Sequence, residues 1–217
     1  MRTFGFPEFL FILEAAQWTL ALSAIAFVGG AILGLVIALA RTSDSKTARG
    51  LSTAFIQVFQ GTPLLLQLFL IFFGAPVLGL DINPWIAAGV ALILNSAAFL
   101  GEIWRGCIQA IPRGQWEAAE ALSLDYTSRM RDVVLPQAFK IALPPTVGYV
   151  VQIIKGTSLA AIIGFTEITR AGQIINNATF QPLIVFSVVG AIYFALCWPL
   201  SFWAGRIEKR QARALAR

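Results

Sequence analysis

The chain has 217 residues, of which 58% are hydrophobic and only 12% are charged. A soluble domain of this size carries about a quarter charged residues, so the composition excludes a globule covered by polar surface. The formal net charge is +5 and His is absent, which removes the commonest general base and a common metal ligand. The apolar residues fall in runs of about 20, the length that spans a hydrocarbon core, and not in the segments of about 10 that a barrel needs. The sequence therefore predicts an all-α membrane protein.

Five stretches are long and apolar enough to cross a membrane. They are residues 16–40, 51–73, 85–101, 142–165 and 182–203. Between and around them we expect an interfacial segment at 1–14, loops at 41–50, 74–84 and 167–181, a polar island at 106–136 and a basic tail at 206–217. In the first stretch, Gly29, Gly30 and Gly34 offer small faces for close helix packing. The pattern predicts a single transmembrane domain over residues 1–217.

The second stretch is unusually polar for a membrane span. Gln60, Thr62 and Gln67 lie within it, and Pro63 removes a backbone donor. The i, i+3, i+7 spacing of Gln60, Pro63 and Gln67 predicts that they share one helical face. Such a face belongs inside a bundle or along a cavity. An alternative is that Thr62 and Gln67 only satisfy the backbone around Pro63.

The polar island at 106–136 is the longest charged, helix-prone stretch in the chain. Acidic residues lead it from Glu117, basic residues follow from Arg129, and Pro136 is expected to end it. The pattern predicts a short helix, a break at 123–125 and a second short helix.

Two interpretations of this island are open from the residues alone. It is either an amphipathic connector on the lipid surface, or a hairpin that docks on a soluble partner. Glu117 would face anionic headgroups in the first case. In the second, Ala118 and Ala119 present a smooth surface, and Trp116 and Leu122 serve as apolar anchors.

The basic residues are distributed unevenly. If the 41–50 loop, the 106–136 island and the tail are cytoplasmic, only Arg2 and Arg170 remain outside, with Lys155 inside the membrane. Cytoplasmic loops carry the excess of Lys and Arg. Five spans then predict an external N-terminus and an internal C-terminus. The positive charge needs no nucleic acid as a partner, and the tail is expected to meet anionic lipid.

The island contains a motif with a specific spacing. Glu117-Ala118-Ala119, three residues, Ser123, nine residues and then 133–136 resembles the EAA loop of ABC importer permeases, which reads EAA, three residues, Gly, nine residues, Ile, one residue, Leu-Pro. Ser123 stands where the family has Gly, and a side chain there costs on the order of 1 kcal/mol if the position requires a positive φ. Further stretches are similar to the polar amino-acid subfamily of these permeases: 61–67, 102–106, 108–112 and 156–159.

The resemblance implies the permease subunit of an ATP-driven amino-acid importer, a multi-pass protein of the bacterial inner membrane. Its implied partners are two cytoplasmic ABC ATPase subunits, a second permease, identical or homologous, and an extracytoplasmic solute-binding protein. The island would be the coupling helix, with Glu117 as its main polar contact to the ATPase. The residues implied at this contact are Gly114, Trp116, Glu117, Ala118, Ala119, Leu122 and Ser123.

The chain has no GxxxxGK[ST] phosphate loop, so we expect no cofactor in it, and ATP and Mg would be bound by the ATPase subunits. It is not expected to be an enzyme. An intramembrane enzyme would need catalytic groups, and with neither His nor an acidic pair in the spans the chain lacks the usual ones. An ion-coupled secondary amino-acid carrier would show paired intramembrane carboxylates or an inverted repeat, and neither is evident in the sequence.

Lys155 lies well inside the fourth stretch, where a lysine must face protein or water. One interpretation is a structural ion pair, with Glu102 or with a helix end of the partner subunit. The other is a cation for the α-carboxylate of the translocated amino acid. Glu102 is also expected to pair with Arg105, its i+3 neighbour. Related permeases often carry an acid after this lysine, where this chain has Gly156. The candidate substrate-pathway residues are Lys155, Gln152, Thr157, Ser158, Asn95, Gln60, Thr62, Gln67 and Glu102.

Overall fold

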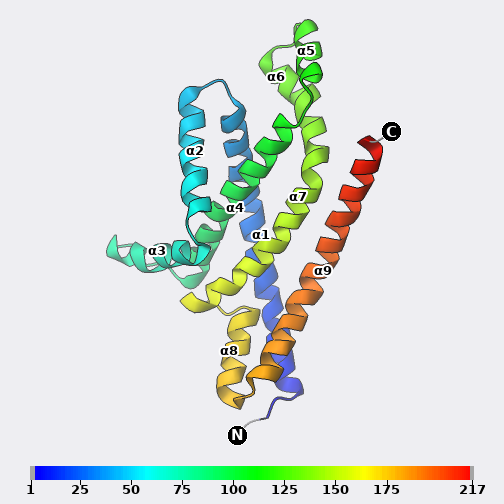
Figure 1. Ribbon diagram of the computed structural model, residues 1–217. Coiled ribbons are helices and arrows are strands. Elements are labelled where there is room, and N and C mark those ends of the chain that lie inside the picture. The colour runs from blue at the N-terminus through cyan, green and yellow to red at the C-terminus, as the bar shows by residue number, and fades with distance from the viewer. Residues whose placement is uncertain (1–2, 216–217) are drawn as a thin grey trace.

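The computed structural model describes residues 3–215 and consists of helices joined by short connections (Figure 1). The elements are α1 (Phe6–Thr42), α2 (Lys46–Gly61), α3 (Leu64–Val77), α4 (Pro84–Gln109), α5 (Arg113–Ala121), α6 (Tyr126–Ser128), the π-helical η1 (Arg129–Val134), α7 (Leu135–Gly156), the 3₁₀-helical η2 (Thr157–Ile163), α8 (Ile168–Thr179) and α9 (Pro182–Leu215). The prediction of an all-α protein is confirmed for these residues.

Within residues 3–215, four helical segments are long and apolar enough to cross a membrane. They are Phe6–Thr42, Pro84–Gln109, Tyr126–Ile163 and Pro182–Gln211. The bent pair α2 and α3 adds a fifth if it counts as one span. Helices extend past the predicted spans at several ends, because they continue beyond the apolar runs that mark those spans.

Two segments expected outside the membrane spans are largely helical. α1 begins at Phe6, so most of the segment expected at the interface, 1–14, is the first part of the same helix as the first predicted span; Met1 and Arg2 lie outside the described residues. The loop expected at 41–50 shrinks to 43–45, because α2 starts at Lys46 with the Ser45 hydroxyl capping the Ala48 amide at 3.3 Å.

The polar loop expected at 167–181 is the amphipathic helix α8. Glu167 caps its first turn, and Ile168, Ala171 and Ile175 are buried against α1 and α9. These residues recur at helical spacing, and the polar residues between them occupy the other face. The polarity of the segment favours a loop, but its buried residues recur at the spacing of a helix.

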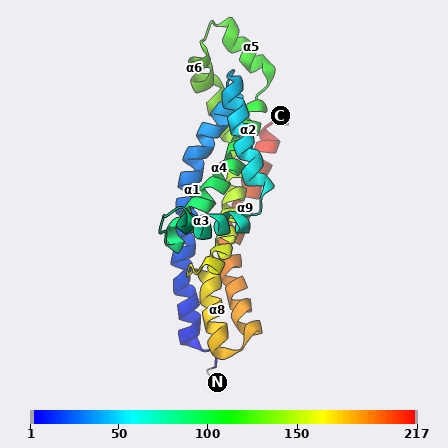
Figure 2. The same ribbon diagram turned by 90° about the vertical axis from the view of Figure 1, so that its left-hand side faces the viewer.

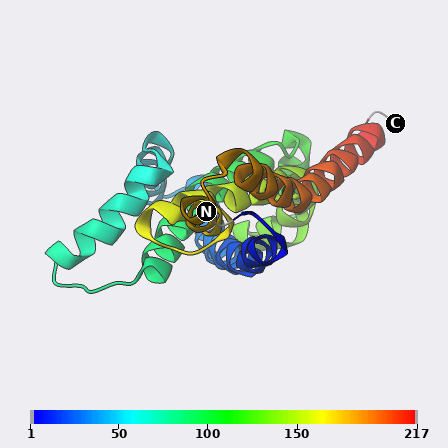
Figure 3. The ribbon, with the colours of Figure 1, turned by 90° about the horizontal axis from the view of Figure 1, so that it is seen from below.

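The second predicted span is broken, and α2 and α3 meet at 100°. Pro63 occupies the N-cap of α3, so the helix cannot run through it. Gln60 therefore lies on α2 and Gln67 on α3, and the expectation that Gln60, Pro63 and Gln67 share one helical face is wrong. Seen from below, α3 and the C-terminal part of α9 reach away from the bundle in opposite directions (Figure 3).

The expected close packing on the glycines of α1 is confirmed. A Cβ on Gly30 would lie 2.5 Å from the Ser96 Cβ, and one on Gly29 would lie 2.8 Å from Ile93. On the facing helix α4, a Cβ on Gly101 would lie 2.8 Å from Ile37. Small residues on both helices therefore allow close contact over many turns, which is how apolar helices associate without a solvent-driven force.

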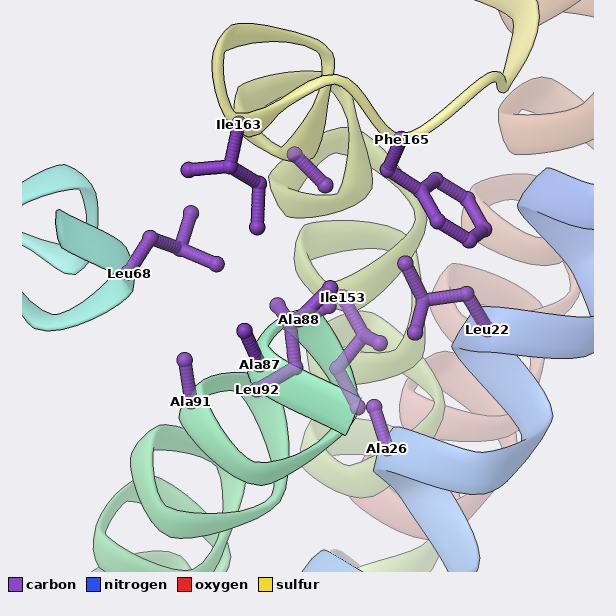
Figure 4. Packing of buried hydrophobic residues seen from close by; sticks show 11 residues of the cluster. Leu22, Ala26, Leu68, Ala87, Ala88, Ala91, Leu92, Ile153, Ile163 and Phe165 are labelled. Carbon is purple, nitrogen blue, oxygen red and sulfur yellow. The ribbon is translucent and has the colours of Figure 1, made fainter. Parts of the chain in front are cut away.

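The largest apolar cluster lies where α1, α3, α4, α7 and η2 converge (Figure 4). Leu22 of α1, Leu68 of α3, Leu92 of α4 and Ile153 of α7 point toward one another. Phe165 closes the cluster and meets the Trp85 ring edge-on at 4.6 Å. This cluster fixes the start of α3 against the end of α7.

The elongated molecule carries different elements at its two ends (Figure 2). The hairpin of α5, α6 and η1 lies at the end toward which α9 runs, and the start of α1 lies beside α8 at the other (Figure 1). The basic tail is helical as far as Leu215, and Arg217 lies outside the described residues.

Candidate functional site

The polar island folds as a helical hairpin with the predicted break. α5 ends in a two-bond C-terminal motif, in which the Ser123 amide donates to the Glu120 carbonyl at 2.8 Å and the Leu124 amide to the Ala119 carbonyl at 3.2 Å. Ser123 has φ 56°, the left-handed conformation that this motif requires and that glycine adopts most easily. The position where the motif has Gly thus does require a positive φ.

The second arm starts at once and runs into α7. The Asp125 carboxylate accepts from the amides of Thr127 at 3.2 Å and Ser128 at 3.4 Å, and bonds from Ser128 lower its pKa. η1 continues into α7 without a gap. The expectation that Pro136 ends the island is therefore wrong, because Pro136 sits in the first turn of α7, where a missing amide is tolerated.

A small apolar core holds the hairpin to the end of α4 and the start of α7. Its buried members are Ile108, Ile111, Met130, Val134 and Ala138. Trp116 packs against this cluster, and across the hairpin Arg129 approaches Glu120 at 3.8 Å. The hairpin is thus attached to the helices behind it, above all to α7.

The candidate ATPase-contact residues divide into two groups. Ala119 is 2% exposed and Trp116 is half-buried, and both support the hairpin from inside. Leu122 is 75% exposed. The remaining candidates, Gly114, Glu117, Ala118 and Ser123, are also exposed. The exposed candidates therefore combine the Glu117 carboxylate, small residues and one large apolar side chain.

The bend between α2 and α3, called the elbow below, is surrounded by polar residues. Several of them form one hydrogen-bonded cluster. The Gln67 side-chain amide donates to the Phe59 carbonyl at 2.8 Å and to the Thr62 carbonyl at 3.0 Å. The Asn95 amide donates to the Gln67 side-chain oxygen at 3.2 Å, and the Tyr149 hydroxyl donates to the Asn95 side-chain oxygen at 3.3 Å. Gln67 is buried, so its primary effect is to satisfy carbonyls that the bend at Pro63 leaves open.

Gln60 and Thr62 take different positions at the same elbow. The Gln60 amide donates to the Ala98 carbonyl at 3.2 Å, and the Thr62 hydroxyl donates to the Val58 carbonyl at 2.7 Å. Both residues are exposed, unlike Gln67. Gln60 and Thr62 thus make the outer surface of the elbow polar, whereas Gln67 is buried inside it.

The end of α7 brings together a second set of candidates. Lys155 is exposed and lines a groove of about 260 Å³ against Tyr193, Cys197 and Trp198 of α9. Gln152 is also exposed, one turn earlier on α7.

Two other predicted pathway residues near Lys155 have local partners. Thr157 is fully buried and donates to the Ile154 carbonyl at 2.7 Å, and the Ser158 hydroxyl donates to the Lys155 carbonyl at 2.6 Å. A Cβ on Gly156 would lie 3.2 Å from Leu64, so a larger side chain there would press on the start of α3.

Glu102 lies apart from both groups. The Arg105 Nε donates to it at 2.8 Å, which confirms the expected i, i+3 pair, and Arg41 approaches it at 3.7 Å. Among the described residues its ion-pair partners are these two arginines, so a Glu102–Lys155 pair within the chain is not formed. Glu102 belongs with the α1–α2 turn, not with the elbow.

The sequence reasoning missed one polar cluster at Glu167. This carboxylate is fully buried, accepts from the Arg170 amide at 2.9 Å, and accepts from the Tyr193 hydroxyl at 2.5 Å. Burial raises the pKa of Glu167. An acid followed by apolar residues at helical spacing is a helix-start signal that could have found it.

Comparisons with known proteins agree on one kind of protein. The family described as "Binding-protein-dependent transport system inner membrane component" matches residues 30–213. The chain is 35% identical to the probable amino-acid ABC transporter permease protein YckA of Bacillus subtilis, over 94% of this chain and 91% of the relative. It is 38% identical to the arginine transport system permease protein ArtQ of the same organism, over 94% of both chains. A solved structure described as an amino acid ABC transporter with histidines has a TM-score of 0.88 and 33% identity, over 96% of this chain and all of that chain.

Proposed function

The chain belongs to the family of binding-protein-dependent transport system inner membrane components, and we propose that it is the permease subunit of an ATP-driven importer of amino acids. It is a multi-pass membrane protein of the ABC importer class, a transport subunit and not a catalytic one. The names of the relatives support amino acids as the substrate class. Family membership favours this function over an ion-coupled carrier.

The exposed hairpin is the observation that carries the mechanism. Its surface places Glu117 beside Ala118 and Leu122, all exposed, at one end of the molecule. A helix with a smooth surface and one apolar anchor suits a groove on a soluble partner. We assign that groove to an ABC ATPase subunit, which binds the ATP and Mg. The same end then faces the cytoplasm, and the α8 end faces outward toward a solute-binding protein.

The hairpin is built to pass movement to the membrane helices. Met130 and Val134 on its second arm share an apolar core with Ala138 of α7, and η1 and α7 are continuous. At the far end of α7, Gly156 abuts Leu64 at the start of α3. A displacement of the hairpin would therefore be carried along α7 to the elbow, as in a rigid-body transition.

Transport requires two such units. We propose a dimer with an identical or homologous permease, served by two ATPase subunits, so that closure of the ATPases moves both hairpins. The exposed polar residues that would line the path between the permeases are Gln60, Thr62, Gln152 and Lys155. A lysine in a span requires protein or water beside it, so Lys155 either contacts the second permease or meets the substrate carboxylate.

Reconstitution tests the function directly. The permease, its ATPase subunits and the binding protein are placed in liposomes, and uptake of radiolabelled amino acids is measured. We expect uptake only when the ATPase subunits, ATP and the binding protein are all present. Uptake by the permease alone, driven by an ion gradient without ATP, would contradict the proposal and favour the secondary carrier.

A further inference from the structure

A polar cavity separate from the elbow and the α7 groove lies beside the hairpin. It has a volume of about 350 Å³, and its walls come from the α1–α2 turn, the end of α4 and α5. The residues that matter for its chemistry are Arg41, Ser43, Asp44, Arg49, Gln109 and Trp116. Ligand pockets in proteins have volumes of about 300–1,000 Å³, so this one has room for a small polar group.

The charges around the cavity favour an anion. Among the described residues that line the cavity, Arg41 and Arg49 are cationic and Asp44 is the one carboxylate. The nearby carboxylate Glu102 is engaged mainly by Arg105, and its remaining approach to Arg41 is 3.7 Å. The lining therefore keeps a net positive charge.

Both arginines retain donors for a ligand. Arg49 donates one N–H to the Ser43 carbonyl at 3.1 Å, and among the described residues it forms no ion pair. Arg41 donates one N–H to the Thr53 hydroxyl at 2.6 Å, and its side chain is 23% exposed, so other N–H groups of its guanidinium are left for a ligand. Planar guanidinium groups match the oxygen geometry of phosphate better than any other side chain does.

We propose that this cavity binds a phosphate-class anion held by Arg49 and Arg41. Its source is either the phosphodiester headgroup of an anionic lipid or a free phosphate. In the orientation given above, the cavity opens at the cytoplasmic membrane surface, where anionic headgroups concentrate; this placement rests on the proposed function, whereas anion binding does not. Because Trp116 forms one wall, the anion would connect the α1–α2 turn to the hairpin and stiffen its base.

Thermal unfolding of the full chain in neutral detergent tests the site without requiring transport. Sodium phosphate is titrated against sodium chloride at equal ionic strength, and phosphatidylglycerol is titrated against phosphatidylcholine in mixed micelles. Arg49→Gln removes the charge, Arg49→Lys keeps it without the planar fork, and Lys46→Gln is the matched control. Lys46 is a cation on the same turn that does not line the cavity. Each variant is first confirmed to unfold near the wild-type midpoint without ligand.

We expect a saturable rise in the unfolding midpoint with phosphatidylglycerol, phosphate or both. A response to phosphatidylglycerol alone identifies a lipid site, and a response to phosphate alone identifies a site for the free anion. Arg49→Gln should weaken the apparent affinity about tenfold, as expected for a lost charge-assisted bond, with Arg49→Lys in between and Lys46→Gln unchanged. No saturable response to either probe would overturn the proposal. Equal losses in Arg49→Gln and Lys46→Gln would also overturn it, because they would indicate diffuse surface charge.

Discussion

Ser123 lies at the bend between α5 and α6 in a conformation that disfavours a side chain. Its φ of 56° serves the two bonds that end α5. The same geometry turns the chain so that Asp125 can cap the second arm. The residue therefore sets the angle at which the hairpin surface is presented, at a cost on the order of 1 kcal/mol.

Ser123→Gly should stabilise the hairpin by about 1 kcal/mol, because glycine adopts this conformation without a Cβ clash. Hydrogen exchange at the amides of α5 would measure the change as slower local opening. Ala121→Gly, two residues earlier in the helix, is the matched control and should destabilise α5 by about 1 kcal/mol. If both variants loosen α5 equally, the strain assigned to Ser123 is absent.

Glu167 is the buried acid whose titration should be visible in stability. Its folded pKa is raised above the ordinary value of 4.5 by burial. The folded state thus holds the proton more tightly, and this contribution to stability is full below pH 4.5 and is lost as pH rises through the folded pKa. Glu167→Gln keeps an oxygen for the Arg170 amide and should become progressively more stable than the wild type above pH 4.5.

The matching loss-of-cap variant is Glu167→Ala, which should be about 1 kcal/mol less stable than Glu167→Gln at every pH, because neither side chain titrates in this range. Thermal unfolding in detergent across pH 4 to 8 would compare both with Glu14→Gln, a substitution of an exposed acid on α1. A Glu167→Gln profile parallel to the wild type would show that Glu167 does not titrate differently on folding.

The α2–α3 elbow shows at the scale of elements what the sequence could and could not predict. The polar residues and Pro63 marked the region as unusual, and one interpretation, that Gln67 satisfies the backbone, matches its bonds to Phe59 and Thr62. The bend itself was missed. A window of apolar residues reports that a segment enters a membrane, but not whether it continues straight, because tertiary contacts such as the Asn95–Gln67 bond decide that.

The α1–α4 contact makes a prediction at the same scale. Gly30→Ala should destabilise the fold by about 1–3 kcal/mol, because the new methyl group would meet Ser96 and the α4 backbone, which cannot yield without separating the helices. Gly190→Ala on α9 is the control, since a Cβ there meets nothing within 4 Å. It should be neutral or stabilising, because alanine is the better helix former. Thermal unfolding in detergent measures both, and equal effects would contradict the packing argument.

At the scale of the whole molecule, the family and the hairpin were predictable from the sequence. How the candidate pathway residues group in space was not. The EAA spacing from Glu117 to Pro136 is local, so the sequence was enough to recognise it. The candidate pathway residues fall into three separate places, at the elbow, at the end of α7 and at Glu102, because their positions depend on how distant helices cross. Glu167 was missed for a related reason: its importance comes from Tyr193, far along the chain.

The most direct test of the central claim is to purify the tagged chain from native membranes in mild detergent and quantify the ATPase subunit that comes with it. We expect the wild type to retain the ATPase, Glu117→Lys to lose most of it, and Asp132→Lys, the same charge reversal at an exposed position on the second arm, to retain it. Retention by Glu117→Lys at the wild-type level would contradict the assigned contact. A wild-type chain that purifies without any ATPase would contradict the whole account.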